Sequence, residues 1–258
     1  MNFDPGFEIR PTVQPMGFAY GEGVFGPQVE VRHLDAIRKS LREPQCEGPD
    51  EVYAIAMDVG REEDRSAMLE RGLLYGAVTY ASGRLGQEPV RSQGHIHAVS
   101  ACGMSTPEVY EIWSGRAVIY MQERDTDDPG RCFAVYAGPG EVVIVPPGWA
   151  HATISADPEQ PLTFGAWCVQ DYGFVYDGVR AHGGMAYYPL LNEDGSLRWL
   201  RNEAYDAPEI IIKRPEAYAQ LGLEKGVSIY EQFRRDYDRF LFVPQPMRAK
   251  DVWEGFVP

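Results

Sequence analysis

Three histidines and one glutamate stand at spacings that could build a metal site in this 258-residue chain. His95 and His97 form an H-x-H pair, Glu108 follows after a gap of ten residues, and His151 ends the run Pro146-Pro147-Gly148-Trp149-Ala150-His151. Because alternate residues of a strand face the same side, His95 and His97 should project together, and we expect Glu108 and His151 to join them from neighbouring strands. Imidazole nitrogens with one carboxylate suit a divalent ion such as iron(II), manganese, nickel or zinc, and they leave positions open for substrate or water.

Short strands separated by turns would carry these residues. The 27 glycines and 20 prolines fall in small clusters, and the apolar runs between them predict strands at residues 52–57, 72–80, 109–120, 132–137, 141–145, 152–155 and 162–169. Residues 1–30 read as an extended arm, residues 31–41 as one short helix, and the tail from residue 214 as helical, mainly over 217–223 and 228–240. This pattern predicts an all-β barrel in a single domain over 1–258, with an arm and helix in 1–50, the barrel core in 51–180 and a C-terminal extension in 181–258.

Charge and composition exclude several classes of function. The formal net charge of −14 argues against a nucleic-acid partner, since phosphate backbones bind basic surfaces. No apolar run is long enough to span a membrane, and the N-terminus, Met1-Asn2-Phe3-Asp4-Pro5, is not a signal peptide, so we expect a cytoplasmic protein. The four cysteines, Cys46, Cys102, Cys132 and Cys168, form no C-x-x-C pair, and we expect no disulfide framework.

Taken singly, an H-x-H pair is commonly a polar strand face, and a Pro-Pro-Gly segment is commonly a turn. Their combination is more specific. Glu108 stands in an E-x6-G spacing with Gly115, and the segment from Gly140 to His151 reads G-x5-P-x-G-x2-H, both in order after H-x-H. Glu111 is a competing carboxylate but breaks the E-x6-G spacing. In these two motifs the chain resembles the cupin superfamily, which implies a jelly-roll β-barrel (a double-stranded β-helix) with one bound metal ion; the longer gap before Glu108 implies an inserted loop over 99–106.

Three further sequence motifs restrict the resemblance to one family of cupins. Glu108-Val109-Tyr110, the full run 145–151 and Asp171-Tyr172-Gly173 are similar to the archaeal-type (cupin) glucose-6-phosphate isomerases over roughly residues 30–180. The resemblance implies His95, His97, Glu108 and His151 as metal ligands, with one divalent ion per subunit and iron(II) preferred. It also implies a homodimer that interconverts glucose 6-phosphate and fructose 6-phosphate, a step of glycolysis and gluconeogenesis.

Moving a hydrogen between C1 and C2 of a sugar requires a group that takes a proton and an electrophile that steadies the oxyanion. Glu108 is the expected proton-transfer group. Tyr110 lies on the same strand face, where it could hydrogen-bond sugar hydroxyls or simply fill the barrel.

The resemblance also implies donors for the substrate's phosphate. They map onto Tyr53, Ser92 and Gly94, and onto Thr79, although this threonine falls between Val78 and Thr79 in register.

Two positions depart from the family pattern: Cys168 stands where the family has a tyrosine, and Gln170 where it has a histidine. His182 is a candidate substitute for that histidine. A different substrate therefore stays open, as do an iron(II) cupin dioxygenase and a non-catalytic sugar-binding cupin. Polar phosphate donors near Ser92 favour the isomerase, an apolar aromatic-lined pocket favours the dioxygenase, and loss of the metal favours the binding protein.

Overall fold

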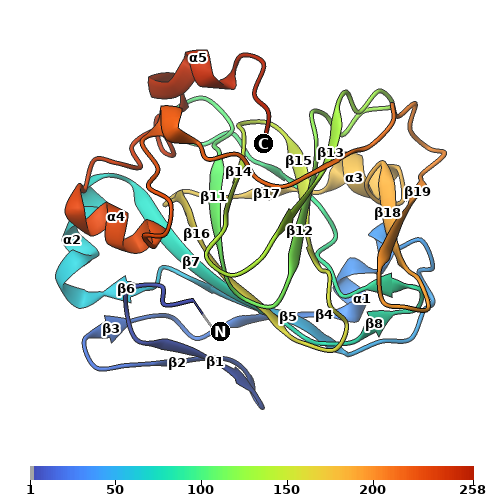
Figure 1. Ribbon diagram of the computed structural model, residues 1–258, viewed down its shortest axis with the longest axis horizontal. Helices are drawn as coiled ribbons and strands as arrows, with labels where there is room; N and C mark the ends of the chain where they lie inside the picture. Colours follow the sequence, from blue (N-terminus) through green and yellow to red (C-terminus); the bar gives the residue numbers. More distant parts are fainter. Residues whose placement is uncertain (1–2) are drawn as a thin grey trace.

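Two β-sheets that face each other form the centre of the protein, whose computed structural model describes residues 3–258 (Figure 1). Their strand orders are β14-β11-β16-β7-β5-β4 and β15-β12-β13-β20, and every neighbouring pair is antiparallel except β13 and β20. The larger sheet contains β4 (Glu30–His33), β5 (Glu51–Met57), β7 (Leu73–Tyr80), β11 (Glu108–Ser114), β14 (Val142–Val145) and β16 (Leu162–Val169). The smaller sheet contains β12 (Ala117–Gln122), β13 (Cys132–Ala137), β15 (Ala150–Ser155) and β20 (Ile211–Lys213). The predicted jelly-roll architecture is confirmed.

Short paired strands and short helices surround this centre. The outer strands are β1 (Ile9–Val13) with β2 (Met16–Tyr20), β3 (Val24–Phe25) with β6 (Gly60–Arg61), β8 (Arg84–Leu85) with β9 (Glu88–Pro89), β10 (Ile96–His97) with β17 (Phe174–Val175), and β18 (Tyr187–Leu191) with β19 (Leu197–Arg201). The α-helices are α1 (Leu34–Ile37), α2 (Arg65–Glu70), α3 (Asp177–Ala181), α4 (Ile229–Arg235) and α5 (Lys250–Trp253). The 3-10 helices are η1 (Arg38–Ser40), η2 (Glu62–Asp64), η3 (Ala219–Leu221) and η4 (Pro246–Ala249).

The main hydrophobic core lies between the two sheets. On β11 the inward residues Tyr110 and Ile112 belong to it, while Val109 and Trp113 belong to a second core on the outer face. This alternation is the period of two that a strand imposes. Burying each large apolar side chain contributes about 1.5–3 kcal/mol, so the two cores together fix which face of β11 points into the barrel.

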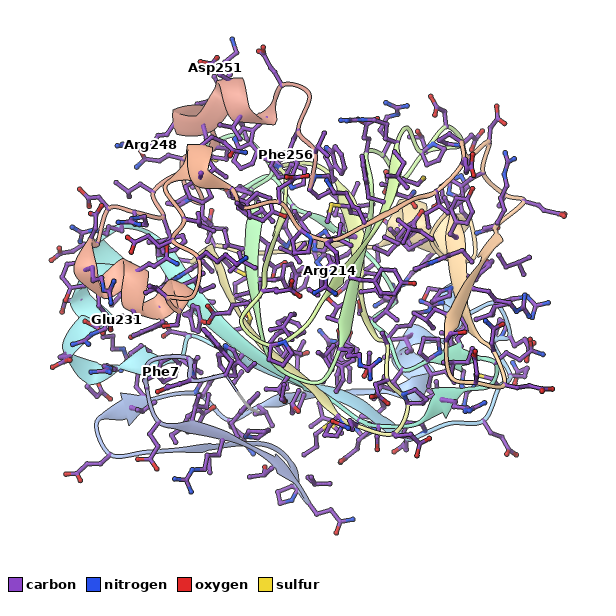
Figure 2. The ribbon with its side chains drawn as sticks, in the orientation of Figure 1. Phe7, Arg214, Glu231, Arg248, Asp251 and Phe256 are labelled. Atoms are coloured by element: carbon purple, nitrogen blue, oxygen red, sulfur yellow. The ribbon has the colours of Figure 1, made fainter. Side chains whose placement is uncertain are left out.

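The C-terminal segment covers the outer face of the six-stranded sheet. The ring of Trp167 lies 5.7 Å from that of Tyr230, 4.6 Å from that of Phe233 and 5.6 Å from that of Phe240. Ser228 caps α4 by accepting a hydrogen bond from the amide of Glu231. Figure 2 shows Glu231 on α4 close to Phe7 of the N-terminal segment, which packs against the same core. Both ends of the chain therefore stabilise the sheet that carries Glu108.

Several predicted boundaries differ from the structure. The predicted strand 109–120 is two strands, because Gly115 adopts a φ of +79° at the turn from one sheet to the other. A Cβ there would lie 2.6 Å from the carbonyl oxygen of Pro161, which explains why the E-x6-G spacing ends in glycine. The predicted helix 31–41 is shortened to α1 and η1, because residues 30–33 pair with β5 instead.

The two terminal segments also differ in detail. The N-terminal segment is extended, as predicted, but it folds back into the hairpin β1–β2; Met1 and Asn2 lie outside the described residues. The C-terminal extension contains short helices, as predicted, but it also adds β20 to the smaller sheet. The two sheets thus recruit strands from both sides of the interval 51–180. None of the helices in residues 3–258 has the length and apolar character that a membrane crossing requires.

Candidate metal centre

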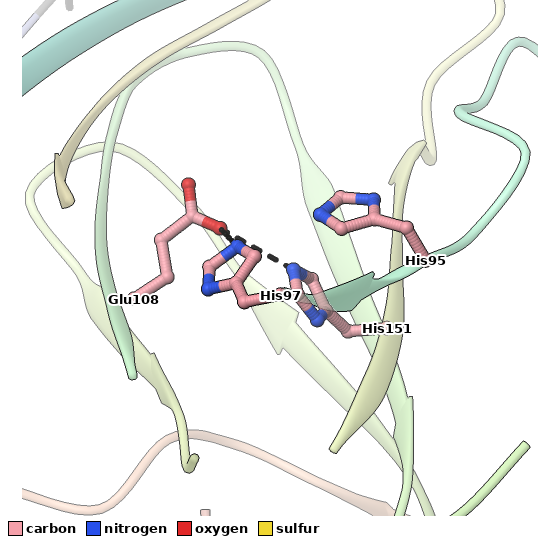
Figure 3. Close-up of side chains that lie close together, drawn as sticks. All are labelled: His95, His97, Glu108 and His151. Carbon is pink, nitrogen blue, oxygen red and sulfur yellow. Dashed lines mark hydrogen bonds and ion pairs between the residues drawn. The ribbon is translucent and has the colours of Figure 1, made fainter. Parts of the chain in front are cut away.

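The four predicted ligand residues come together inside the barrel. One nitrogen or oxygen atom from each of His95, His97, Glu108 and His151 lies within 4.8 Å of the others. The Nε2 atoms of His97 and His151 lie 3.1 and 3.3 Å from Oε2 of Glu108. Figure 3 shows these four side chains pointing toward one another. A divalent cation is the ligand whose charge and size suit this donor set.

Backbone carbonyls orient two of the histidines. Nδ1 of His97 lies 2.9 Å from the carbonyl oxygen of Thr106, and Nδ1 of His151 lies 3.2 Å from that of Trp149. Each carbonyl fixes the orientation of its ring so that Nε2 faces the centre of the cluster, where a metal ion would lie. Thr106 belongs to the predicted insertion 99–106, so this loop supports the site. Nε2 of His95 is buried without a hydrogen-bond partner in residues 3–258, as expected for an atom that awaits a ligand.

The charges of the cluster also fit a cation. Burial raises the pKa of Glu108, but hydrogen bonds from His151 and His97 outweigh burial and hold the pKa well below its ordinary value. Burial, with His151 and His97 nearby, lowers the pKa of His95 far below its usual range. The site therefore presents an ionised carboxylate and a neutral imidazole, which are the protonation states that metal ligands need.

The four candidate ligand residues come from both sheets and from the segment 95–97. Glu108 begins β11 in the six-stranded sheet, and His151 lies on β15 in the four-stranded sheet. The expectation that they sit on neighbouring strands is wrong, because the cluster bridges the space between the sheets. His95 reaches it by pairing its backbone with that of His151, and His97 follows on β10. The rings of His95 and His97 are stacked 5.3 Å apart, so the pair faces one side as predicted.

A narrow pocket, with a cavity volume of about 60 Å³, extends from the cluster between the sheets. Its lining is mixed. Phenol groups of four tyrosines and the side chains of Ser92, Gln93 and Thr153 provide polar atoms, whereas aliphatic residues, Phe164 and Phe174 make the rest apolar. The lining residues are Tyr53, Ile55, Met57, Val78, Tyr80, Ser92, Gln93, His95, Glu108, Tyr110, Thr153, Phe164, Phe174 and Tyr176.

Some of the residues predicted to bind the substrate line this pocket and others do not. Tyr53, Ser92 and Tyr110 line it, and the hydroxyl of Tyr110 donates a 2.8 Å hydrogen bond to Oε2 of Glu108. Gly94 has a φ of +91°, and a Cβ there would lie 2.5 Å from the sulfur of Met185, so this position requires glycine in the turn that leads to His95. Thr79 was predicted to bind the phosphate, but it is not among the residues that line the pocket.

Thr79 points to the opposite face of β7. Its hydroxyl lies 3.1 Å from that of Thr163, while its neighbour Val78 lines the pocket. Successive residues of a strand face opposite sides, so an uncertainty of one residue in the register left open whether residue 78 or residue 79 faces the pocket. The phosphate donor expected here is replaced by an apolar side chain.

The two positions that depart from the family pattern behave differently. Cys168 lies beside the cluster, where its thiol is 3.4 Å from Oε1 of Glu108, and burial raises the pKa of this thiol well above its ordinary value. Gln170 instead donates to the carbonyl of Leu73. His182 contacts Asp127 and stacks on the ring of Tyr205, and it is not part of the pocket lining. His182 therefore does not replace the family's histidine.

Sequence reasoning missed the aromatic wall next to the cluster. Phe174 pairs with His97 across β10 and β17, and its ring lies 4.5 Å from that of His95. Tyr172, Phe174 and Tyr176 alternate along the chain, a period of two that could have indicated a shared strand face.

The competing carboxylate, Glu111, lies on the outer face of β11. It is fully buried and accepts a 2.8 Å hydrogen bond from the amide of Ile229, while its other oxygen has no partner among the described residues. Burial raises the pKa of Glu111 to about 8. Glu111 is therefore separated from the cluster by the strand itself.

We expect Glu111→Gln to stabilise the protein at alkaline pH. The folded state keeps a proton on Glu111 up to a pKa of about 8, whereas the unfolded chain loses it near its ordinary value, so the free energy of unfolding falls as pH rises between these values. A glutamine does not ionise, so it removes this pH-dependent loss of stability, and its side-chain oxygen can still accept the hydrogen bond from the amide of Ile229. Between pH 5.5 and 8 the advantage of the variant should grow by up to about 3 kcal/mol. Urea denaturation at both pH values measures it, with exposed Glu159→Gln as control; an equal difference at the two pH values would contradict the account.

Comparison with known proteins agrees with this geometry. The family model described as glucose-6-phosphate isomerase (GPI) matches residues 32–208. The chain belongs to this family. Among curated relatives, the glucose-6-phosphate isomerase of Thermococcus gammatolerans is 30% identical over 168 residues, which are 65% of this chain and 77% of the relative. Those of Thermococcus kodakarensis and Pyrococcus furiosus are each 29% identical over 152 residues, which are 59% of this chain and 70% of each relative.

Solved structures with partial similarity include oxalate oxidase and the oxalate decarboxylase of Bacillus subtilis. Oxalate oxidase has a TM-score of 0.32 and 17% identity over 40% of this chain and 45% of its own. The decarboxylase has a TM-score of 0.36 and 18% identity over 51% of this chain and 29% of its own. The family assignment rests on the sequence match over residues 32–208.

Proposed function

We propose that this protein is a metal-dependent aldose-ketose isomerase that interconverts glucose 6-phosphate and fructose 6-phosphate. The observation that carries the proposal is the convergence of three imidazoles and Glu108 at one end of a pocket, in a chain of the glucose-6-phosphate isomerase family. His95, His97, Glu108 and His151 would hold one divalent ion. When bound, that ion supplies the electrophile that polarises the C1 and C2 oxygens.

Glu108 has the surroundings of a proton-transfer group. Its Oε2 accepts a hydrogen bond from the hydroxyl of Tyr110 and faces His97 and His151. Its Oε1 has only the weak contact with the thiol of Cys168. Oε1 is therefore the atom free to take a proton from one sugar carbon and return it to the next. Tyr110 holds the carboxylate in place and presents its ring to the pocket. Tyr53 and Ser92 line the same pocket and would meet the phosphate.

The finer assignments follow from the same residues and from the family. We propose iron(II) as the ion, since imidazole and carboxylate ligands suit it. We also propose that residues 1–258 form one domain, that two chains associate as a homodimer, and that the protein works in the cytoplasm.

The isomerase proposal is tested by turnover of fructose 6-phosphate to glucose 6-phosphate with the purified, metal-loaded protein. The reaction consumes no oxygen, so full turnover is expected under nitrogen, and turnover in air should be no higher. This comparison also addresses the second candidate, an iron(II) dioxygenase, which is favoured by Phe164 and Phe174 in the pocket wall. No isomerisation under either condition, or a reaction that requires oxygen, would contradict the proposal.

A further inference from the structure

Two arginines stand at the end of the pocket where the substrate's phosphate would lie. Arg32 is on β4, where it pairs with Tyr53 of β5, and Arg180 is on α3, with its guanidinium over the ring of Tyr176. Both tyrosines line the pocket. Neither arginine is among the phosphate donors that the family resemblance implies. They come from segments far apart in the chain, so only the fold brings them to one place.

Arg180 is held in position by neutral groups. Its Nε donates a 2.9 Å hydrogen bond to Oε1 of Gln93, and its guanidinium carbon lies 4.7 Å from the centre of the Tyr176 ring. No carboxylate pairs with it in residues 3–258. A guanidinium has five N–H donors in a planar fork, so Arg180 keeps donors and an uncompensated charge for an anion. Gln93 and Tyr176 line the pocket, which places this charge at its rim.

Arg32 lies beside Tyr53, with which it pairs across β4 and β5. Burial raises the pKa of the phenols of Tyr53 and Tyr176, and the neighbouring guanidinium of Arg32 partly offsets that effect. The carboxylate partner of Arg32 is Glu30, whose side chain is 61% exposed. An exposed ion pair of this kind contributes little, so a phosphate dianion can compete with Glu30 for the guanidinium.

The overall charge of the protein makes local positive charge important for an anionic substrate. A formal net charge of −14 repels an anionic substrate, and local positive charge at the mouth of a pocket is the usual means of attracting one. The hydroxyl expected from Thr79 does not reach the pocket, and Val78 lines it instead, so more of the phosphate recognition is left to charged groups.

We propose that Arg32 and Arg180 recognise the phosphate group of the substrate and thereby select phosphorylated sugars over free sugars. The inference rests on the proposed isomerase function for the identity of the sugar. It assigns the anion to the part of the pocket lined by Tyr53 and Tyr176, where the ring of Tyr176 lies 6.0 Å from that of His95. Arg32 and Arg180 are thus specificity-determining residues, whereas Glu108 carries the proton.

The test compares Arg180→Gln and Arg32→Gln with the native protein, all loaded with metal. Arg198→Gln is the matched control, since Arg198 is exposed on β19 and outside the pocket lining. We expect each pocket variant to raise KM for fructose 6-phosphate about 10-fold to 100-fold, the loss of one charge-assisted hydrogen bond. The turnover number should change far less than KM. Inorganic phosphate, measured by calorimetry, should bind both variants more weakly by a similar factor.

Two outcomes separate this inference from the proposed function. If both variants keep the native KM and the native affinity for inorganic phosphate, the inference is overturned while the isomerase function stands. If the native protein does not isomerise fructose 6-phosphate but binds inorganic phosphate in an Arg32- and Arg180-dependent manner, the anion site stands and the proposed function fails.

Discussion

Replacing His97 by alanine is expected to abolish both metal binding and the turnover of fructose 6-phosphate. His97 is one of three histidines in the cluster, and the carbonyl of Thr106 fixes its ring so that Nε2 faces Glu108. Disturbing only the partners that orient a ligand costs roughly 10-fold to 100-fold in metal affinity or activity, so removal of the ligand itself should exceed about 100-fold. Metal content per chain and turnover number, measured on the same sample, check the prediction.

The matched control is His33→Ala. His33 ends β4, is half exposed and pairs with Asp50 at the surface. This variant should keep the metal and the activity of the native protein. An active His97→Ala protein without metal would show that turnover does not depend on the cluster.

Glu108→Gln is expected to lower the turnover number by about 10²-fold to 10⁴-fold, the range that a positioned proton-transfer group contributes. Glutamine has nearly the same shape and can still accept from Tyr110, but it cannot take up a proton at Oε1. The fold should therefore remain intact, and KM should change much less than the turnover number. Steady-state kinetics at saturating metal, together with metal content, separate lost chemistry from lost metal.

Glu111→Gln provides the control on the same strand. Glu111 faces the outer core and Glu108 faces the cluster, so the same chemical change three residues away should leave turnover near native. A Glu108→Gln protein with native turnover number would assign the proton transfer to another group. Equal losses in both variants would indicate damage to β11 rather than to the chemistry.

The four residues of the cluster could be predicted from the sequence because glycines with a fixed backbone role stand near them. Gly115 has a positive φ and no room for a side chain, and Gly94 has the same two constraints just before His95. Such positions leave a visible spacing in the sequence. The spacing does not indicate which sheet a strand joins. His151 was therefore expected on a strand next to that of Glu108, but it lies on the facing sheet.

The phosphate end was less predictable for a physical reason. A shift of one residue along a strand exchanges its two faces, and the sequence placed the expected threonine only to within that one residue. The structure puts Val78 in the pocket and Thr79 behind it. Arg32 and Arg180 carry no local signal at all, since a single arginine in a sequence reads as a solvated side chain.

The presence of helices in the C-terminal tail was predicted correctly, but their lengths were not. Helices of one or two turns are marginal alone, so their limits depend on packing rather than on propensity. α4 covers only Ile229–Arg235 within the predicted 228–240, and it is fixed by the aromatic contacts of Tyr230 and Phe233 with Trp167. The strand β20 was missed because its pairing with β13 joins segments distant in the chain.

The most direct test of the central claim is a metal titration of the stripped protein. Chains freed of metal would be loaded separately with iron(II), manganese, nickel or zinc, and the conversion of fructose 6-phosphate to glucose 6-phosphate would be measured beside the amount of ion bound. The account predicts no turnover without metal and full turnover when about one ion is bound per chain, as a single four-ligand cluster requires. Undiminished turnover in the stripped protein, or a bound ion that restores none, would contradict it.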